Sequence, residues 1–412
     1  MQNTPSEFDI IIAGAGPGGC AAALTLRDQG LRILILDKAT FPRDKICGDA
    51  LSGKVRSVLR YIAPDLEQSL LDMPAKLGSW GIRFVAPNGG ELDVPFKHTP
   101  DLSQPAPGFI SKRLDFDQFL VDQVKNIPGV ELKENCSLRS VQQERDHIRV
   151  ESSQGKFTAS LLIAADGAQS VAARQLVNRK VLPKHHSAGV RAYVSQVSGF
   201  HTQNFIELHF LPELLPGYFW IFPLPNGQAN VGLGMLTADL KQQKLDLKKA
   251  LRETIFNHPR FKDRFVSSEI LGPIQGFGLP LGSQRSPLSG ERFMLVGDAG
   301  ALIDPFSGEG IGNAMLSGKK AAEVAMEALR EQDFSATFLE RYDQIVYQKI
   351  GQELALSYRL QRLVQYPWLF NWVVKKARGN PSFETLFTMM FEQVDTRKIF
   401  SSPKFYWRLL VG

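Results

Sequence analysis

Residues 8–19 read FDIIIAGAGPGG, and this stretch decides the fold. Its first half is short, apolar and β-branched, which predicts a buried parallel strand over residues 8–13. Gly14, Gly16 and Gly19 follow with the spacing GxGxxG. The first glycine permits a tight turn, the second lets the backbone approach a pyrophosphate, and the third permits close packing of helix on strand. The stretch therefore predicts a strand–loop–helix unit that binds a dinucleotide.

The chain after this loop continues as a βαβ unit. We expect a helix over residues 20–29 that ends at Gly30 as its C-cap residue. A second buried strand is expected over residues 31–36, and Asp37 follows it directly. A carboxylate at that strand end can bind ribose hydroxyls and would repel a 2′-phosphate. The candidate cofactor-binding residues of this unit are Gly14, Ala15, Gly16, Gly19, Asp37 and Lys38.

Two later motifs also stand at predicted strand ends. Residues 164–170 read AADGAQS, and residues 297–312 read GDAGALIDPFSGEGIG. Asp298 can accept a hydrogen bond from a ribityl hydroxyl. The helix expected from about Gly310 to Glu331 can turn its positive end toward the pyrimidine edge of a flavin, which favours the reduced anion. An ordinary Asp-Gly turn and a glycine-rich helix start are the alternatives. The candidates here are Asp166, Gly167, Gly297, Asp298, Pro305, Gly308, Gly310, Ile311 and Gly312.

In this order, the three motifs resemble those of the flavoprotein group that contains para-hydroxybenzoate hydroxylase. The resemblance covers about residues 8–330 and implies that all three motifs surround one FAD. That group also carries an arginine before a cofactor-contacting helix, and Arg113 in ISKRLDF, residues 110–116, matches it. The resemblance implies an α/β fold: a Rossmann-type FAD-binding domain with an inserted antiparallel-sheet substrate domain and a helical C-terminal region.

Within that group, two segments resemble the geranylgeranyl reductase family. Residues 41–49, FPRDKICGD, contain its Lys-x-Cys-Gly pattern as Lys45, Cys47 and Gly48, and residues 218–223, YFWIFP, match its Tyr-x-Trp-x-Phe-Pro motif. The resemblance implies that the first segment passes the isoalloxazine and the second lines the substrate cavity. It also implies reduction of prenyl C=C bonds by reduced FAD.

The candidate catalytic residues follow from these two segments. We expect hydride transfer from flavin N5 to one alkene carbon and a proton to the other. Cys47 is a candidate acid by position and Tyr218 by chemistry, with Trp220 beside them. Small-residue packing for Cys47 and purely structural roles for Tyr218 and Trp220 are the alternatives. Ile46, Asp49 and Ala50 depart from the family pattern, and these departures bear on the substrate more than on the reaction class.

The expected substrate is an apolar small molecule. An aromatic strand gives a rigid apolar wall for a hydrocarbon chain. Such a substrate partitions into membranes, so the enzyme must collect it at a lipid surface, and peripheral contact is one interpretation of three aromatic-basic clusters. Core aromatics beside a solvated charged edge are the other. The clusters are residues 366–372, YPWLFNW; residues 375–378, KKAR; and residues 405–408, FYWR.

Other functions remain open from the residues alone. A flavin monooxygenase shares the fold, and so does a flavin halogenase, although Tyr218 and Phe222 break the halogenase pattern Trp-x-Trp-x-Ile-Pro. A prenyl-binding protein similar to the GDP-dissociation inhibitors would not need the intact phosphate loop or Asp298. No second dinucleotide fingerprint is present, so NAD(P)H docking transiently, or a ferredoxin, is the expected electron donor.

Composition limits the remaining choices. The chain has 412 residues, which suggests about two domains. The net charge of +6 fits an anionic ligand, an anionic membrane surface or a bland basic surface, and no signature of nucleic-acid binding accompanies it. Three scattered cysteines predict neither a disulfide framework nor a metal site, and they favour the reducing cytoplasm. We expect no transmembrane helix and a monomer.

The expected boundaries interleave two domains. The FAD-binding domain takes residues 1–75, 109–180 and 281–335. The substrate domain takes a hairpin in residues 76–108 and an antiparallel sheet in residues 181–280, with a helix over residues 241–257. A helical region, residues 336–412, completes the chain.

Overall fold

The structure, a computed structural model that describes residues 7–97 and 101–378, is built around three β-sheets. The eight-stranded sheet is formed by β1 (Phe8–Ala13), β2 (Ile33–Leu36), β8 (Val130–Lys133), β9 (Leu138–Gln143), β10 (Ile148–Ser152), β11 (Gly155–Ala164), β17 (Ser289–Gly290) and β18 (Phe293–Leu295). The seven-stranded sheet is formed by β5 (Gly81–Val85), β6 (Glu91–Pro95), β12 (His186–Val194), β13 (Ile206–His209), β14 (Tyr218–Leu224), β15 (Gln228–Leu236) and β16 (Ile270–Pro280). The small sheet is formed by β3 (Ala50–Leu51), β4 (Leu77–Ser79) and β7 (Gly108–Ile110).

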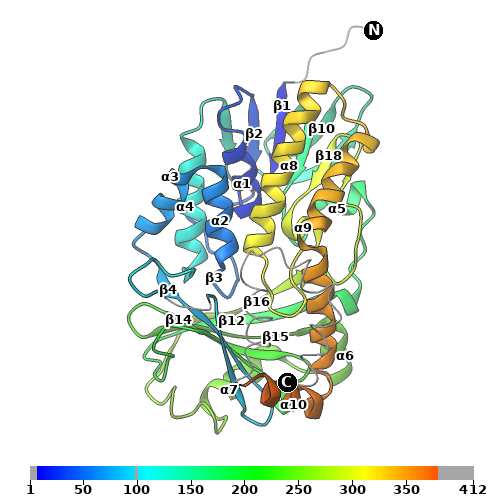
Figure 1. The fold of residues 1–412 in the computed structure, drawn as a ribbon. Helices are drawn as coiled ribbons and strands as arrows, with labels where there is room; N and C mark the ends of the chain where they lie inside the picture. The colour runs from blue at the N-terminus through cyan, green and yellow to red at the C-terminus, as the bar shows by residue number, and fades with distance from the viewer. Residues whose placement is uncertain (1–6, 98–100, 379–412) are drawn as a thin grey trace.

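Helices cover the eight-stranded sheet and extend beside the seven-stranded one (Figure 1). They are α1 (Pro17–Thr25), α2 (Gly53–Ile62), α3 (Pro64–Asp72), α4 (Arg113–Lys125), α5 (Val171–Leu176), α6 (Thr237–Gln243), α7 (Leu247–Phe256), α8 (Ile311–Glu331), α9 (Ala336–Leu363) and α10 (Pro367–Ala377). The predicted fold class, a Rossmann-type α/β domain with an inserted sheet domain and C-terminal helices, is confirmed.

The centre of the eight-stranded sheet is parallel and fully buried. Strand β1 lies between β2 and β11, with Ile10 opposite Ile33 on one side and Leu161 on the other. Helices α1 and α8 pack closely, because a side chain at Gly318 would come within 2.0 Å of the Gly18 carbonyl oxygen. Both helices follow the carboxyl ends of parallel strands, β1 and β18, so their N-termini lie at one end of the sheet.

The seven-stranded sheet departs from the purely antiparallel sheet that the sequence predicts. Strand β13 runs parallel to β5 of the hairpin, while the other pairs are antiparallel. The parallel pair joins segments separated by more than a hundred residues, and local alternation carries no information on their relative direction. Strand β16, which the sequence analysis missed, forms the other edge beside β12.

Two helix predictions were wrong in their bounds. The helix expected over residues 20–29 begins at Pro17, whose missing N–H costs nothing at the first position, and it ends at Thr25. Gly30 therefore lies beyond the helix. The helix expected over residues 241–257 divides into α6 and α7. Lys244 adopts a left-handed conformation, and the Asp246 carboxylate caps α7 by accepting hydrogen bonds from the amides of Lys248 and Lys249.

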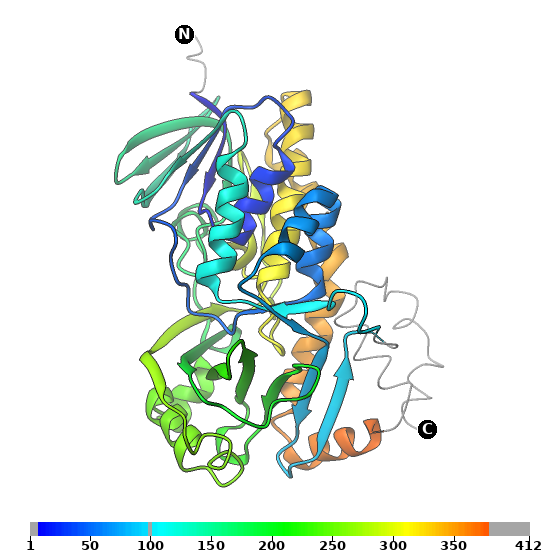
Figure 2. The same ribbon diagram turned by 90° about the vertical axis from the view of Figure 1, so that its left-hand side faces the viewer.

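The C-terminal helices connect the two large sheets. Helix α9 runs from the eight-stranded sheet down beside the seven-stranded one (Figure 1). In the turned view, the light-blue hairpin of β5 and β6 lies beside the orange α9 and α10 (Figure 2). The predicted aromatic-basic cluster at residues 405–408 lies outside the described residues.

Candidate functional site

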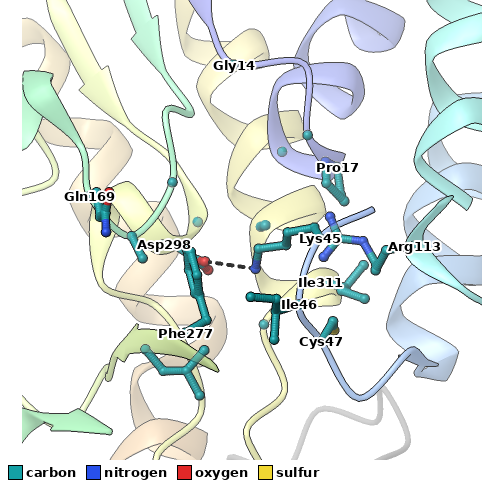
Figure 3. A pocket seen from close by; sticks show the side chains of 18 of the residues that line it. Gly14, Pro17, Lys45, Ile46, Cys47, Arg113, Gln169, Phe277, Asp298 and Ile311 are labelled. Atoms are coloured by element: carbon teal, nitrogen blue, oxygen red, sulfur yellow. Dashed lines mark hydrogen bonds and ion pairs between the residues drawn. The ribbon is translucent and has the colours of Figure 1, made fainter. Parts of the chain in front are cut away.

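A cavity of about 730 Å³ lies between the eight-stranded and seven-stranded sheets (Figure 3). All three sequence motifs reach it, from the loop after β1, the strand end of β11 and the segment between β18 and α8. The predicted site residues that line it are Gly14, Gly16, Asp37, Lys38, Lys45, Cys47, Gly48, Arg113, Asp166, Gly167, Tyr218, Trp220, Gly297, Asp298, Gly308, Gly310 and Ile311. Residues that are distant in sequence thus line the same cavity.

The loop after β1 is shaped to receive a phosphate group. A side chain at Gly14 would meet the Ala165 carbonyl oxygen at 2.3 Å, and one at Gly19 would meet the Gly14 oxygen at 1.9 Å, so these two glycines serve packing. At Gly16 the nearest neighbour of an added β-carbon is an Arg43 nitrogen at 3.8 Å. No side chain caps the N-terminus of α1. The free amide end and bare Gly16 fit a pyrophosphate.

Asp37 is a buried carboxylate at the end of β2 that lines the cavity. Its two oxygens accept hydrogen bonds from the backbone amides of Ala15 and Ala39, each at 2.8 Å. Ala15 therefore contributes its amide to holding Asp37 and does not itself line the cavity. The arrangement fixes an acidic group beside the phosphate loop, where a ribose would lie.

Asp298 carries the third motif into the cavity from the opposite side. The Lys45 ammonium reaches across to its carboxylate at 3.4 Å (Figure 3). Gly308, Gly310 and Ile311 follow along the wall to the start of α8. The Lys45 ammonium is paired with the Asp298 carboxylate, and the Gly312 amide at the start of α8 is bonded by the Glu309 carboxylate, so this side of the cavity carries charges of both signs.

Four predicted cofactor-binding residues do not line the cavity: Ala15, Gly19, Pro305 and Gly312. The Pro305 carbonyl accepts a hydrogen bond from Gln361 at 2.6 Å. The Gly312 amide donates to the Glu309 carboxylate at 2.6 Å. These residues belong to the motifs because they support the loop and the helix. The spacing of a motif does not distinguish such support from contact with a ligand.

Asp166 lines the cavity, but its carboxylate also caps α5. It accepts hydrogen bonds from the Ser170 hydroxyl at 2.6 Å and from the Val171 amide at 2.7 Å. Burial raises the pKa of Asp166, against the effect of these hydrogen bonds. Gly167 adopts the left-handed conformation at φ +79°, which agrees with the Asp-Gly turn given above as the alternative to a cofactor contact.

Cys47 lies beside the Arg113 guanidinium at the cavity wall (Figure 3). Burial acts to lower the pKa of Arg113, but the neighbouring Asp117 carboxylate and the Cys47 thiol raise it. Arg113 and Arg43 both bind the fully buried Asp117, at distances of 2.6 Å. The thiol thus sits next to a permanently charged, firmly held arginine.

An aromatic wall from β14 closes the cavity on the side of the seven-stranded sheet. Tyr218, Trp220 and Phe222 alternate along the strand toward the cavity. The wall contacts the Cys47 segment, because a side chain at Gly48 would meet the Phe222 ring at 2.6 Å. Burial raises the pKa of Tyr218, so its hydroxyl keeps its proton, and that hydroxyl donates to the Ser307 carbonyl at 3.3 Å.

The sequence analysis missed several charged and aromatic residues of the cavity. Arg43 and Asp44 stand in the quoted segment 41–49, where the arginine could have been noticed as a second cation near the phosphate loop. Arg191 of β12 pairs with Asp44 at 2.5 Å and stacks over the Tyr193 ring. Phe277 belongs to the unpredicted β16, and no motif marks it.

Among the described residues, no group of three or more His, Cys, Asp or Glu side chains is placed to hold a metal ion. Within the same residues, no helix combines the length and the apolar character that a membrane crossing requires.

Comparison with known proteins agrees with this geometry. The FAD binding domain family matches residues 7–346. A menaquinone reductase of Mycobacterium tuberculosis is 29% identical over 383 residues, covering 89% of this chain and 86% of that protein. A digeranylgeranylglycerophospholipid reductase of Methanocella arvoryzae is 29% identical over 367 residues, covering 87% and 88%.

Solved structures share the fold. A geranylgeranyl bacteriochlorophyll reductase-like protein of Thermoplasma acidophilum superposes with a TM-score of 0.79 at 21% identity, covering 95% of this chain and 98% of that one. The flavin-dependent brominase Bmp2 superposes with a TM-score of 0.75 at 20% identity, covering 93% of each chain. The chain therefore belongs to the FAD binding domain family, as an FAD-dependent oxidoreductase similar to the geranylgeranyl reductases.

Proposed function

We propose that this chain reduces C=C bonds of a prenyl or isoprenoid lipid-like substrate. The observation that carries the proposal is the aromatic wall of Tyr218, Trp220 and Phe222, which faces the cavity that also holds the FAD motifs. Of the two relatives named above, one is a digeranylgeranylglycerophospholipid reductase by name and the other is a menaquinone reductase, which supports the proposal. When bound, FAD supplies a hydride from its reduced N5 to one alkene carbon.

We propose that the seven-stranded sheet serves the substrate and the eight-stranded sheet serves FAD. On this division, residues 76–108 and 181–280 form the substrate domain, residues 1–75, 109–180 and 281–335 form the FAD domain, and residues 336–412 are the C-terminal region. The cavity-lining members of the three motifs contact FAD. The apolar wall binds the hydrocarbon by burial, worth about 0.8 kcal/mol per CH₂.

We propose two candidate donors of the proton for the second alkene carbon, Tyr218 and Cys47, which both line the cavity. Tyr218 presents a phenol at the cavity wall, and burial raises its pKa, which keeps the phenol protonated and makes it a weak acid. Cys47 stands beside Arg113, on the segment that faces the same wall through Gly48. We propose Tyr218 as the donor, with Cys47 as the alternative, and NAD(P)H or a ferredoxin as the external source of electrons.

We propose that α10 rests on a lipid surface from which the substrate enters. Trp368, Tyr366 and Trp372 are 71%, 54% and 41% exposed, although large aromatic side chains are usually buried. Exposed Lys375 and Lys376 follow on the same helix. Aromatic and basic side chains together suit the interface of an anionic membrane.

A row of aromatic rings joins α10 to the cavity. Phe370, on the buried side of α10, lies 4.8 Å from Phe210 between ring centroids, and Phe210 lies 5.7 Å from Tyr218. Apolar contact thus continues from the exposed helix to the cavity wall. This continuity supports α10 as the side from which a lipid approaches.

The proposed reaction is tested without oxygen. Purified yellow protein is photoreduced and mixed with geranylgeraniol or a prenyl phospholipid. We expect reoxidation of the flavin, and a product heavier by two hydrogen atoms for each reduced bond. Reoxidation only after oxygen is admitted, with hydroxylated product, would instead establish a monooxygenase.

The same assay separates the proton donors. Tyr218→Phe keeps the ring and removes the proton, so we expect slow reoxidation with flavin content unchanged. Cys47→Ala should then retain most of the rate. The reverse pattern would assign the proton to Cys47.

A further inference from the structure

Three glycines form a bare floor on the cavity side of the seven-stranded sheet. On β15, Gly232 lies opposite Trp220 of β14, and Gly234 lies opposite Tyr218. On β12, Gly189 lies opposite Gly234. Directly opposed residues in antiparallel strands point to the same face. The floor beneath the aromatic wall therefore carries no side chain at Gly189, Gly232 or Gly234.

The Trp220 indole lies over this floor and is held there. A side chain at Gly232 would meet the indole at 2.0 Å, so the ring covers that position. The indole N–H donates to the Asn230 side-chain oxygen at 3.0 Å. The Asn230 amide nitrogen donates in turn to the Cys47 carbonyl at 2.7 Å and to Asp49 at 2.8 Å. These fixed bonds prevent the ring from swinging away.

Gly189 differs from Gly232, because nothing in the packing requires a glycine there. An added β-carbon would meet Leu233, Leu279 and Trp220 atoms at 3.7–3.8 Å, which is ordinary contact. Gly189 does not adopt the left-handed backbone conformation that favours glycine. Glycine within a strand costs about 0.5–1 kcal/mol relative to alanine. The missing side chain leaves space at a position that lines the cavity.

We infer that Gly189 is a specificity-determining residue, which leaves room beside the edge of Trp220 for the methyl branches of an isoprenoid chain. The inference rests on the proposed function and names the feature of the substrate that this part of the cavity selects. A branched chain is wider than a linear one at each methyl-bearing carbon. Trp220 is held in place on the other side, so a larger side chain at Gly189 narrows the cavity. The methyl branches of a substrate would be excluded before its linear chain.

The variant Gly189→Val tests this through binding, which needs no turnover. The probes are phytanol, a saturated branched alcohol, and hexadecanol, a linear one, each titrated into the FAD-loaded protein and followed by the flavin absorbance change. We expect phytanol to bind at least about tenfold more weakly, equivalent to about 1.4 kcal/mol. Hexadecanol should change by less than about twofold, and Gly189→Ala should fall between wild type and Gly189→Val.

Gly276→Ala provides the matched control. Gly276 lies on the neighbouring strand β16 opposite Val190, hence on the other face of the sheet from Gly189. The Gly276→Ala variant should bind both alcohols as tightly as wild type does. The flavin content should be unchanged in all variants. Equal weakening of both alcohols by Gly189→Val, or no weakening, would overturn the inference. Failure of the wild type to turn over prenyl lipids contradicts the proposed reaction and is seen in a separate assay.

Discussion

Asp49 is an ionisable residue that the fold buries completely behind the cavity wall. One of its carboxylate oxygens accepts hydrogen bonds from Asn230 and from the Tyr193 hydroxyl, both at 2.8 Å, while the other has no partner. Burial raises the pKa of Asp49 from 3.8 to about 6, although the two hydrogen bonds act to lower it. The residue stands in a left-handed conformation at φ +68°.

The stability of the fold should therefore depend on the charge of Asp49. The pKa of Asp49 is higher in the folded than in the unfolded protein. Protonated Asp49 therefore contributes fully to the free energy of unfolding at low pH, and this contribution is lost as pH rises through about 6. Asparagine is uncharged, tolerates the left-handed conformation and can accept both hydrogen bonds. As pH rises from 4 to 8, we expect the free energy of unfolding of Asp49→Asn to increase by about 2 kcal/mol relative to that of wild type. Urea denaturation at each pH measures this difference.

The control for this prediction is Asp263→Asn, at an exposed carboxylate. Its free energy of unfolding should follow the wild-type pH profile. Parallel profiles for Asp49→Asn and wild type would show that Asp49 does not titrate in this range.

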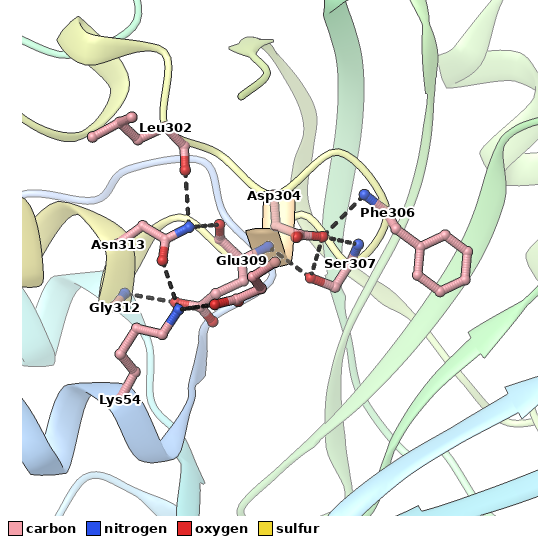
Figure 4. A network of polar contacts seen from close by, with 9 residues as sticks. Lys54, Leu302, Asp304, Phe306, Ser307, Glu309, Gly312 and Asn313 are labelled. Carbon is pink, nitrogen blue, oxygen red and sulfur yellow. Dashed lines mark hydrogen bonds and ion pairs between the residues drawn. The ribbon is translucent and has the colours of Figure 1, made fainter. Parts of the chain in front are cut away.

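At the scale of elements, a partly buried polar network joins α2, α9, the start of α8 and the loop before it (Figure 4). The Lys54 ammonium donates to Asn313 at 2.7 Å and to both oxygens of Glu353 at 3.1 Å. Burial acts to lower the pKa of Lys54, but Glu353 and Glu309 raise it. Burial raises the pKa of both glutamates. The network therefore depends on one cation shared by two carboxylates.

Removal of that cation should destabilise the loop that borders the cavity. Lys54→Met keeps the length of the side chain but leaves partly buried carboxylates without their cation, a loss between the about 1 kcal/mol of a surface pair and the about 3–5 kcal/mol of a fully buried one. We expect a lower melting temperature and faster release of FAD, because Gly308 and Gly310 of this loop line the cavity. Thermal unfolding followed by flavin fluorescence measures both.

Lys125→Met provides the comparison. Lys125 pairs with Glu134 at 3.0 Å at the surface, where such a pair is worth at most about 1 kcal/mol. A loss of stability for Lys54→Met no larger than for Lys125→Met would contradict a supporting role for the network.

At the scale of the whole molecule, the exposed face of α10 and the cavity are parts of one proposed path for a lipid. Replacing both Trp368 and Trp372 by serine removes the apolar contact without touching the cavity. We expect binding to vesicles of anionic phospholipid to weaken at least about tenfold, and binding of the wild type to fall with added salt. Co-sedimentation with the vesicles measures both effects.

Tyr61→Ser is the matched control, since Tyr61 on α2 is as exposed as Trp368 but stands elsewhere in the fold. It should sediment with vesicles like wild type. Equal binding of the double tryptophan variant and wild type would contradict α10 as the docking face.

The extent to which the sequence predicts the site varies with the kind of residue. Gly14, Gly16 and Asp298 could be found because each stands at the end of a recognisable buried strand, and strand ends gather at one edge of a parallel sheet. Pro305 and Gly312 have the same motif signal but serve the loop and the helix. Local spacing is identical for a residue that touches a ligand and one that supports it.

By itself, the sequence determined the flavin motifs and the aromatic strand, because those depend on the order and spacing of residues within short segments, and its resemblance to a known flavoprotein group implied the fold class. Only the tertiary structure decided that Asn230 ties Trp220 to Asp49, that Gly189 leaves open space beside that ring, and that β13 runs parallel to β5. Those facts depend on the register between strands and on burial, which pairs residues such as Asn230 and Asp49 across 181 positions of chain. No local pattern encodes contacts at that separation.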